Sequence, residues 1–289
     1  GLNRDSAAAK RCIALSGLGE VYMRQQVAVV IVPIFSAFCA SYVGAEDKNT
    51  LRVLSYNTHH GAGMDGRIDL ERIAKVITSV SPDIVSLQEV DKNVSRSENV
   101  DQAKELARLT DMHYVFGRSI DLGHGQYGNA VLTKLPVQTT ETIPLPGKER
   151  RSALCVTLRT SDRDSAHEFV FIATHFDLDT DLQIASVPLI EKLFDVDKDV
   201  PAILAGDLNA GPGSPTMKHV ETYWNNATCR EGLFTFPAKN PNAQIDHILY
   251  RGSRDYDVLE TRVLEEAVAS DHRAILAVLQ FNPTLDRKK

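Results

Sequence analysis

The chain has 289 residues, of which 43% are hydrophobic and 24% are charged, and this balance excludes a disordered or fibrous protein. Its length allows one domain with a large hydrophobic core. The formal net charge of −6 argues against a surface that binds nucleic acid mainly through lysine and arginine, but it does not exclude an enzyme that meets phosphate through a metal ion.

The first distinctive segment is the apolar run at residues 27–40, which lacks helical or strand periodicity. Its apolar core is shorter than the roughly 20 residues that a membrane-spanning helix needs, and small residues follow it. We therefore expect a cleaved signal peptide over residues 23–45 and a secreted or periplasmic protein, with a membrane anchor over the same residues as the alternative. Residues 1–22 are interpreted as an upstream or non-native segment.

From residue 47 to residue 282 the pattern is that of one domain, followed by a polar tail at 283–289. Strands are predicted over residues 51–57, 83–89, 128–134, 153–160, 168–175, 201–207, 245–252 and 273–281. Helices are predicted over residues 69–80, 101–111 and 181–194. Asp69 is placed to cap the first helix, and Pro188 is expected to kink or split the third.

Several of the predicted strands are apolar at consecutive positions, which is typical of strands covered on both faces. The order begins as strand, helix, strand, helix and then becomes rich in strands, which argues against a purely parallel sheet. We predict an α/β (α+β) fold of mixed sheets packed on each other with helices outside. Two cysteines, Cys155 and Cys229, follow the leader, and the sequence leaves their pairing open.

Polar side chains recur where the predicted strands begin or end. They are Asn57, Glu89, His175, Asp207 with Asn209 behind it, Asp246, Asp271 and His272. Asp and Asn are ordinary turn residues, so each of them alone also has a structural interpretation. Glu and His are not favoured by turn chemistry, and burying one without a partner costs about 1–3 kcal/mol. We expect these side chains to satisfy one another or a ligand in a shared crevice.

The chain lacks the G-x-S-x-G and H-E-x-x-H motifs, a P-loop and a dinucleotide-binding glycine motif. These absences exclude the commonest serine hydrolases and zinc proteases. Oxygen ligands such as those of Asn57 and Glu89 suit Mg²⁺, which is held by one or two carboxylates together with waters and substrate phosphate. Hydrolysis at phosphorus is the chemistry that this ligand set favours.

Seven motifs follow one another along residues 51–281: YNTHHG, PDIVSLQEVD, YGNAVLTK, ATHFD, AGDLNA, QIDHILY and SDHRAI. In this order and spacing they resemble the endonuclease/exonuclease/phosphatase superfamily, which includes deoxyribonuclease I, and within it a bacterial secreted member. The resemblance implies a four-layered α/β sandwich, with two mixed β-sheets packed face to face and helices outside. It also implies a metal-dependent phosphoric-ester hydrolase.

The resemblance assigns roles to these residues. Glu89 and Asn57 would bind Mg²⁺ or Mn²⁺, with Asp271 as a further ligand. Asp207 would orient or deprotonate the attacking water, and Asn209 would hold that water or a phosphate oxygen. Histidines 175 and 272 would contact the non-bridging oxygens or protonate the leaving group, with Asp246 paired to His272. Substrate-binding candidates are Tyr127, Asn129 and Arg151.

Some alternatives stay open. Arg151 follows Arg150, so a solvated surface pair is the other interpretation. His59 stands where several relatives carry an acid, which leaves the number of metal ions open. The substrate is expected to be a nucleic acid, a phospholipid of the sphingomyelin type or a small phosphate, and a monomer with no obligate protein partner is expected. A non-catalytic binding module on the same fold is the alternative from another class.

Overall fold

The computed structural model describes residues 50–160, 167–194, 200–252 and 256–281. The predicted leader at 23–45, the segment before it and the polar tail lie outside the described residues. Within the described ranges, no helix is both long and apolar enough to cross a membrane.

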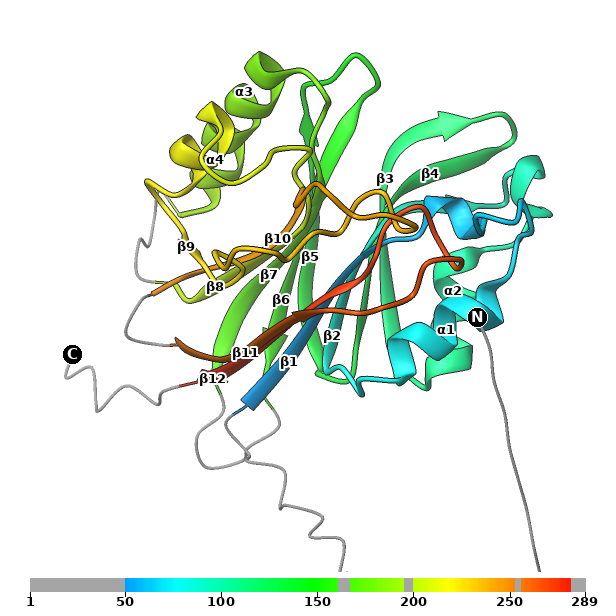
Figure 1. Ribbon diagram of the computed structural model, residues 1–289, viewed down its shortest axis with the longest axis horizontal. Coiled ribbons are helices and arrows are strands. Elements are labelled where there is room, and N and C mark those ends of the chain that lie inside the picture. Colours follow the sequence, from blue (N-terminus) through cyan, green and yellow to red (C-terminus); the bar gives the residue numbers. More distant parts are fainter. Residues whose placement is uncertain (1–49, 161–166, 195–199, 253–255, 282–289) are drawn as a thin grey trace, which may run out of the picture. The chain divides into compact units, whose positions relative to one another are not determined.

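The first of two six-stranded sheets has the spatial order β11-β12-β1-β2-β4-β3 (Figure 1). Its strands are β1 (Thr50–Asn57), β2 (Ile84–Lys92), β3 (His113–Leu122), β4 (Gly125–Thr133), β11 (Tyr256–Val263) and β12 (Ile275–Phe281). Strands β1 and β2 are parallel, and the other neighbours are antiparallel. The sheet is therefore mixed, as predicted.

The second sheet has the order β5-β6-β7-β8-β10-β9. Its strands are β5 (Val137–Leu145), β6 (Arg151–Arg159), β7 (Glu168–His175), β8 (Ala202–Asp207), β9 (Asn225–Asn226) and β10 (Asp246–Arg251). It repeats the plan of the first sheet, because the parallel pair β7 and β8 is flanked by antiparallel strands.

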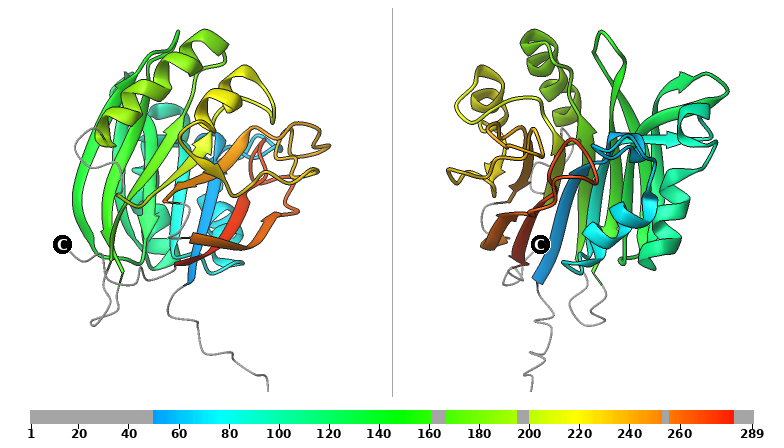
Figure 2. Two further views of the ribbon diagram at one scale, coloured as in Figure 1. Left: turned by 90° about the vertical axis from the view of Figure 1, so that its left-hand side faces the viewer. Right: turned by 45° about the vertical axis from the view of Figure 1, so that its right-hand side comes forward.

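Helices cover the outer face of each sheet, which gives the four layers seen in Figure 2. The helices are α1 (Leu70–Thr78), α2 (Gln102–Thr110), α3 (Thr180–Glu191) and α4 (Pro215–Val220). One core lies between the sheets, where Val53 and Val131 pack with Phe171. The outer cores place α1 and α2 against the first sheet and α3 and α4 against the second. The predicted sandwich architecture is confirmed.

Local sequence signals explain the helix boundaries. The Asp69 carboxylate accepts a hydrogen bond from the Arg72 backbone nitrogen at 2.8 Å, so it caps α1 as predicted. Helix α3 continues through Pro188 to Glu191, so the expected split does not occur. The neighbouring Val187 and Ile190 are buried in the outer core, and their packing outweighs the loss of one backbone hydrogen bond.

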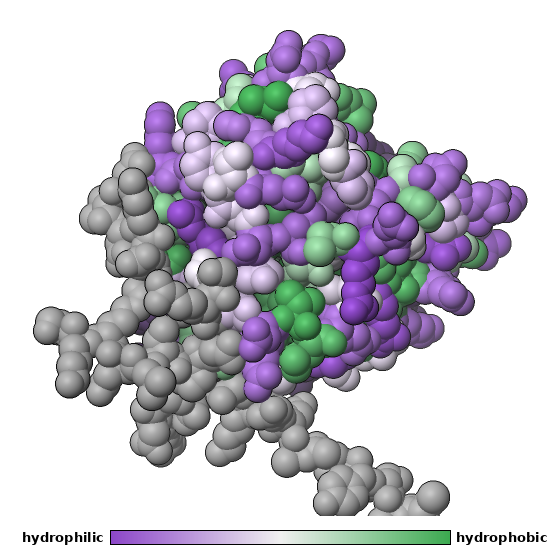
Figure 3. All heavy atoms as spheres, turned by 60° about the vertical axis from the view of Figure 1, so that its left-hand side comes forward, coloured by the Kyte–Doolittle hydropathy of each residue, from purple (hydrophilic) through white to green (hydrophobic). Residues whose placement is uncertain are grey.

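The face drawn in Figure 3 is mainly hydrophilic, and its hydrophobic side chains form small, separate patches. This is the surface expected of a domain that buries its apolar residues.

The two cysteines of the domain are not paired. Cys155 is buried and Cys229 is exposed, and both are free thiols. Burial raises the pKa of Cys155 to about 12, so this thiol is kept protonated.

Candidate active site

Three ionisable side chains stand next to one another where neighbouring strands of the second sheet end or begin. Strands β7 and β8 are parallel and place His175 opposite Asp207. Strand β10 runs antiparallel to β8 and begins at that edge, with Asp246 opposite Asp207. All three side chains are buried. The pairing of the strands alone therefore builds a row of one histidine and two carboxylates, as the strand endings predicted.

The first sheet contributes Asn57 at the end of β1 and Glu89 on β2. The prediction that β2 ends on Glu89 is wrong, because the strand continues to Lys92. Glu89 instead lies at a bulge between Leu87 and Val90 in the pairing with β4, with a φ of 59°. Such a left-handed backbone is unfavourable for a residue with a side chain, and it recurs at functional sites.

The Asn57 side chain joins the two sheets at this edge. Its Nδ2 donates to Glu89 Oε1 at 3.2 Å and to Asp207 Oδ2 at 3.1 Å. One carboxylate comes from each sheet, so oxygens that lie far apart in the sequence share one small space. This contact brings together the residues that the strand endings predicted to meet.

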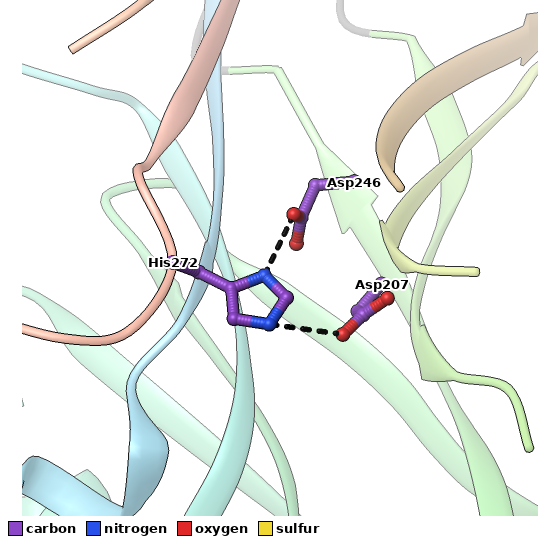
Figure 4. A group of neighbouring side chains, drawn as sticks. All are labelled: Asp207, Asp246 and His272. Carbon is purple, nitrogen blue, oxygen red and sulfur yellow. Dashed lines mark hydrogen bonds and ion pairs between the residues drawn. The ribbon is translucent and has the colours of Figure 1, made fainter. Parts of the chain in front are cut away.

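His272 lies between two carboxylates, as Figure 4 shows. Its Nδ1 is 2.9 Å from Asp246 Oδ2, and its Nε2 is 3.6 Å from Asp207 Oδ2. Burial by itself lowers the pKa of His272, but the charges of Asp246 and Asp207 and the hydrogen bond to Asp246 outweigh it and raise the pKa to about 10. The imidazole is therefore positively charged at neutral pH.

His175 meets the same oxygen of Asp207 but has a different second partner. Its Nε2 is 3.5 Å from Asp207 Oδ2 and 3.2 Å from Asn209 Nδ2. Burial lowers the pKa of His175 to about 4, and the Asp207 charge offsets only part of this shift. The tautomer of the ring decides whether the Asn209 amide or Nε2 donates in this contact.

Asn209 is fixed by the backbone as well as by its side chain. Its φ of 49° is in the left-handed region that asparagine tolerates. Its backbone nitrogen donates to Asp207 Oδ1 at 2.9 Å, and Nδ2 donates to the Phe176 carbonyl oxygen at 3.0 Å. The turn interpretation is confirmed for Asn209, and the same turn holds its amide beside His175, whereas its contact with water or a phosphate oxygen stays a prediction.

Asp271 lies close to the other acids without a direct bond to them in the described part of the chain. Its Oδ1 accepts from Ser270 Oγ at 3.3 Å. Burial raises the pKa of Glu89, and the Asp271 charge raises it further. A metal ligand role for Asp271 stays a prediction.

Ser270 is a site residue to which the sequence assigned no role, and His59 is one whose role the sequence left open. Ser270 Oγ donates to the Asn57 carbonyl oxygen at 2.7 Å and so ties the loop before β12 to the end of β1. The His59 backbone nitrogen donates to Asn57 Oδ1 at 3.1 Å. Both residues sit inside the motifs SDHRAI and YNTHHG, which therefore carried the signal.

The three substrate-binding candidates are buried, with exposed fractions of 6% for Tyr127, 2% for Asn129 and 9% for Arg151. Arg151 is therefore not part of a solvated pair. Its charge contributes to the lowered pKa of His175, although burial dominates that shift. Asn129 Nδ2 donates to the Ser152 carbonyl oxygen at 2.8 Å and links β4 to β6. Their contacts with a substrate stay predictions.

The donor chemistry of this site fits a divalent cation. Carboxylate oxygens of Asp207 and Asp246 lie within 4.8 Å of each other and of a nitrogen of His272. Glu89 and Asp207 both bond to the Asn57 amide, and the raised pKa of Glu89 shows that its charge is poorly solvated. A hard cation bound by these oxygens would stabilise the ionised carboxylates.

The chain is similar in sequence to a known protein family and to a bacterial relative. The model of the endonuclease/exonuclease/phosphatase family matches residues 54–272. The uncharacterized protein YbhP of Escherichia coli (strain K12) is 25% identical over 221 residues, which cover 71% of this chain and 86% of YbhP.

Two solved structures share the fold. An endonuclease/exonuclease/phosphatase from Beutenbergia cavernae is 27% identical, with a TM-score of 0.65 over 81% of this chain and 72% of that one. A mannosyl-6-phosphatase from Bacteroides thetaiotaomicron is 20% identical, with a TM-score of 0.65 over 80% of this chain and 100% of that one.

Proposed function

Because this chain belongs to the endonuclease/exonuclease/phosphatase family, we propose that it is a metal-dependent hydrolase of phosphoric esters. The observation that carries the proposal is the convergence on Asp207 Oδ2. The Asn57 amide, His175 and His272 lie 3.1, 3.5 and 3.6 Å from this one oxygen. A hydrolase needs an acceptor held in this way beside groups that stabilise negative charge.

The two histidines support different tasks. His272, with a pKa raised to about 10, stays charged at neutral pH and can donate from Nε2 to a non-bridging phosphate oxygen. Asp246 fixes the ring orientation through Nδ1. His175 is neutral and acts as a hydrogen-bonding group rather than as a fixed charge. Of the roles considered for the histidines, stabilising charge on the phosphoryl oxygens suits His272 better than giving up a proton.

Asp207 is then the group that orients and deprotonates the attacking water, and Asn209 helps to position it. Glu89 and Asn57 would hold a Mg²⁺ or Mn²⁺ ion, which supplies neutralisation of charge on the substrate phosphate when bound. The expected substrates are phosphate esters of nucleic acids, lipids or small molecules, and the acting species is a monomer.

A metal-titrated screen tests this proposal. The purified protein should hydrolyse at least one member of a panel of DNA, RNA, sphingomyelin, inositol phosphates and sugar phosphates when Mg²⁺ or Mn²⁺ is present. Excess EDTA should abolish that hydrolysis, and Glu89→Gln should shift the Mg²⁺ requirement upward by about 10- to 100-fold, since a carboxylate near the ion is lost.

Glu168→Gln is the matched control, because Glu168 is exposed and begins β7 at the end opposite His175. This variant should behave as the parent protein does. Activity that persists in EDTA would contradict the metal requirement. A folded protein that hydrolyses no member of the panel would favour the non-catalytic binding module.

We also propose that residues 23–45 act as a signal peptide, so that the protein functions outside the cytoplasm. The apolar run and the small residues after it support this proposal. Mass spectrometry of the protein isolated from its native cells should give a mature N-terminus near residue 46.

A further inference from the structure

A positively charged cleft opens beside the site, between the edge strands of the two sheets. It has a volume of about 600 Å³ and is lined by β3, β5 and the loop that leads into β6. Three of its lining residues are arginines, Arg118, Arg150 and Arg151, and none is acidic. In a chain with a net charge of −6, three arginines around one cleft form a local exception.

Arg151 lines this cleft and carries an unsatisfied donor buried in its wall. The side chain is 9% exposed, and its Nε is buried without a hydrogen-bond partner in the described part of the chain. Its Nη1 lies 3.3 Å from Glu149 Oε2. A buried guanidinium nitrogen without an acceptor is unfavourable, and an anionic oxygen supplied by a ligand would satisfy it.

The other two arginines add charge that is only partly neutralised. Arg150 is exposed and forms no ion pair with any carboxylate of the described residues. Arg118 Nη1 lies 2.8 and 2.9 Å from the two carboxylate oxygens of Asp121, and both side chains are exposed. Counting the carboxylates of Asp121 and Glu149 against the three arginines leaves one net positive charge at the cleft.

The loop that carries Arg150 is anchored to the site rather than free. The Lys148 backbone nitrogen donates to Asp177 Oδ2 at 3.0 Å, and Asp177 is a buried residue two positions after His175. Gly147 permits this arrangement, because a Cβ there would collide with the Glu149 carbonyl oxygen and would lie 3.1 Å from Asp177 Oδ2. This anchor holds the loop that lines the cleft at a fixed position relative to His175.

We propose that this cleft binds a second phosphate of the same substrate whose scissile ester lies at Asp207. The inference rests on the proposed function and narrows it to phosphoric esters that carry a further phosphate on the same molecule. An ester with a cationic headgroup, such as a choline phospholipid, is disfavoured, because the arginines repel its positive charge. The polyphosphorylated sugar and the phosphorylated oligonucleotide share this chemistry.

Two substrate pairs distinguish those sources. Glucose 1,6-bisphosphate is compared with glucose 1-phosphate, and the dinucleotide pTpT is compared with TpT. In at least one pair the member with the extra phosphate should have a kcat/KM about tenfold higher, which is the effect of one charge-assisted hydrogen bond. Arg118→Ala/Arg150→Ala should reduce that preference, because it removes two of the three positive charges at the cleft. Arg108→Ala, which alters an exposed arginine on α2, should retain it.

Binding measured without turnover separates the proposal that the cleft binds a second phosphate from the proposal that the protein is a hydrolase. Isothermal titration of the Asp207→Asn protein with each pair should show the same tenfold difference in Kd, and its reduction when the two arginine substitutions are added. Should Asp207→Asn fail to fold, Glu89→Gln serves in its place. A preference in binding without hydrolysis by the parent protein would overturn the proposed function and support the cleft. Hydrolysis with equal kcat/KM within both pairs would overturn the cleft and leave the function standing.

Discussion

His175 and His272 contact the same oxygen of Asp207 at nearly equal distances, yet their pKa values move in opposite directions. Both rings are buried, and burial lowers the pKa of each. The second partner differs, being the amide of Asn209 for His175 and the carboxylate of Asp246 for His272. The charges of Arg151 and His272 lower the pKa of His175 further, and the charge of Asp271 raises that of His272. The charge of Asp207 does not offset the burial of His175, whereas the charges around His272, led by that of Asp246, outweigh its burial.

The largest effect is expected from Asp207→Asn, which removes the partner that both rings share. Hydrolysis should fall about 1,000-fold, because the general base is lost. The pKa of both histidines should fall as well, since the Asp207 charge raises both. Steady-state kinetics and NMR titration of the histidine ring protons in metal-free protein measure the two effects.

Asp111→Asn is the control for this change. Asp111 is an exposed residue at the C-terminal end of α2 with a left-handed backbone that asparagine also adopts. Its kinetics should match those of the parent protein. An Asp207→Asn protein with more than a tenth of the parental activity would exclude Asp207 as the base.

The second effect comes from Asp246→Asn, which makes the surroundings of His272 resemble those of His175. The pKa of His272 should fall from about 10 to below its ordinary value of 6.5, because burial then dominates. Activity at neutral pH should fall about 100-fold, since a fixed positive charge at the site is lost. Histidine NMR signals of the variant that still titrate near pH 10 would contradict the assignment of Asp246 as the cause.

The same change alters the pH dependence of stability. A pKa raised from 6.5 to about 10 means that protonation of His272 stabilises the parent fold fully below pH 6.5, and this contribution is lost as the pH rises towards about 10. In Asp246→Asn this loss should disappear. Urea unfolding at pH 7 and pH 9.5 measures how much the free energy of unfolding changes with pH in the parent protein and in Asp246→Asn, and the two changes are compared.

The smallest effect is expected from Asn209→Asp, which gives His175 a second carboxylate. The pKa of His175 should rise above about 4, but by less than the fall at His272, because the new carboxylate faces the Phe176 carbonyl oxygen and will turn away from it in part. NMR titration measures the shift. Asn209→Ala is the control, in which burial keeps the pKa of His175 low. An equal pKa of His175 in the two variants would contradict the view that a second carboxylate raises it.

The sequence predicted those parts of the fold and site that depend on local patterns. Asp69 caps α1, and the polar endings at His175, Asp207 and Asp246 meet because parallel and antiparallel strands bring those ends to one edge. Alternating or apolar runs gave the central strands. They gave no sign of β3, β5 and β11, which carry many exposed polar residues. All three are edge strands, which have a neighbouring strand on one side only and meet solvent on the other.

Other features depend on contacts between distant segments. The bulge at Glu89 arises from the register between β2 and β4, which no window of sequence around Glu89 contains. The burial of Arg151 depends on tertiary packing, so the sequence could not decide between a substrate-binding arginine and a solvated surface pair. The tie from Ser270 to Asn57 spans 213 positions in the chain.

The amide bridge of Asn57 has a consequence for the newly made protein. Asn57 and Asp207 are separated by 150 positions, and each belongs to a different sheet. Because the two residues come from different sheets, this contact forms only once both sheets have folded and packed together. The site is therefore a product of the packing of the two sheets, and neither sheet contains it alone.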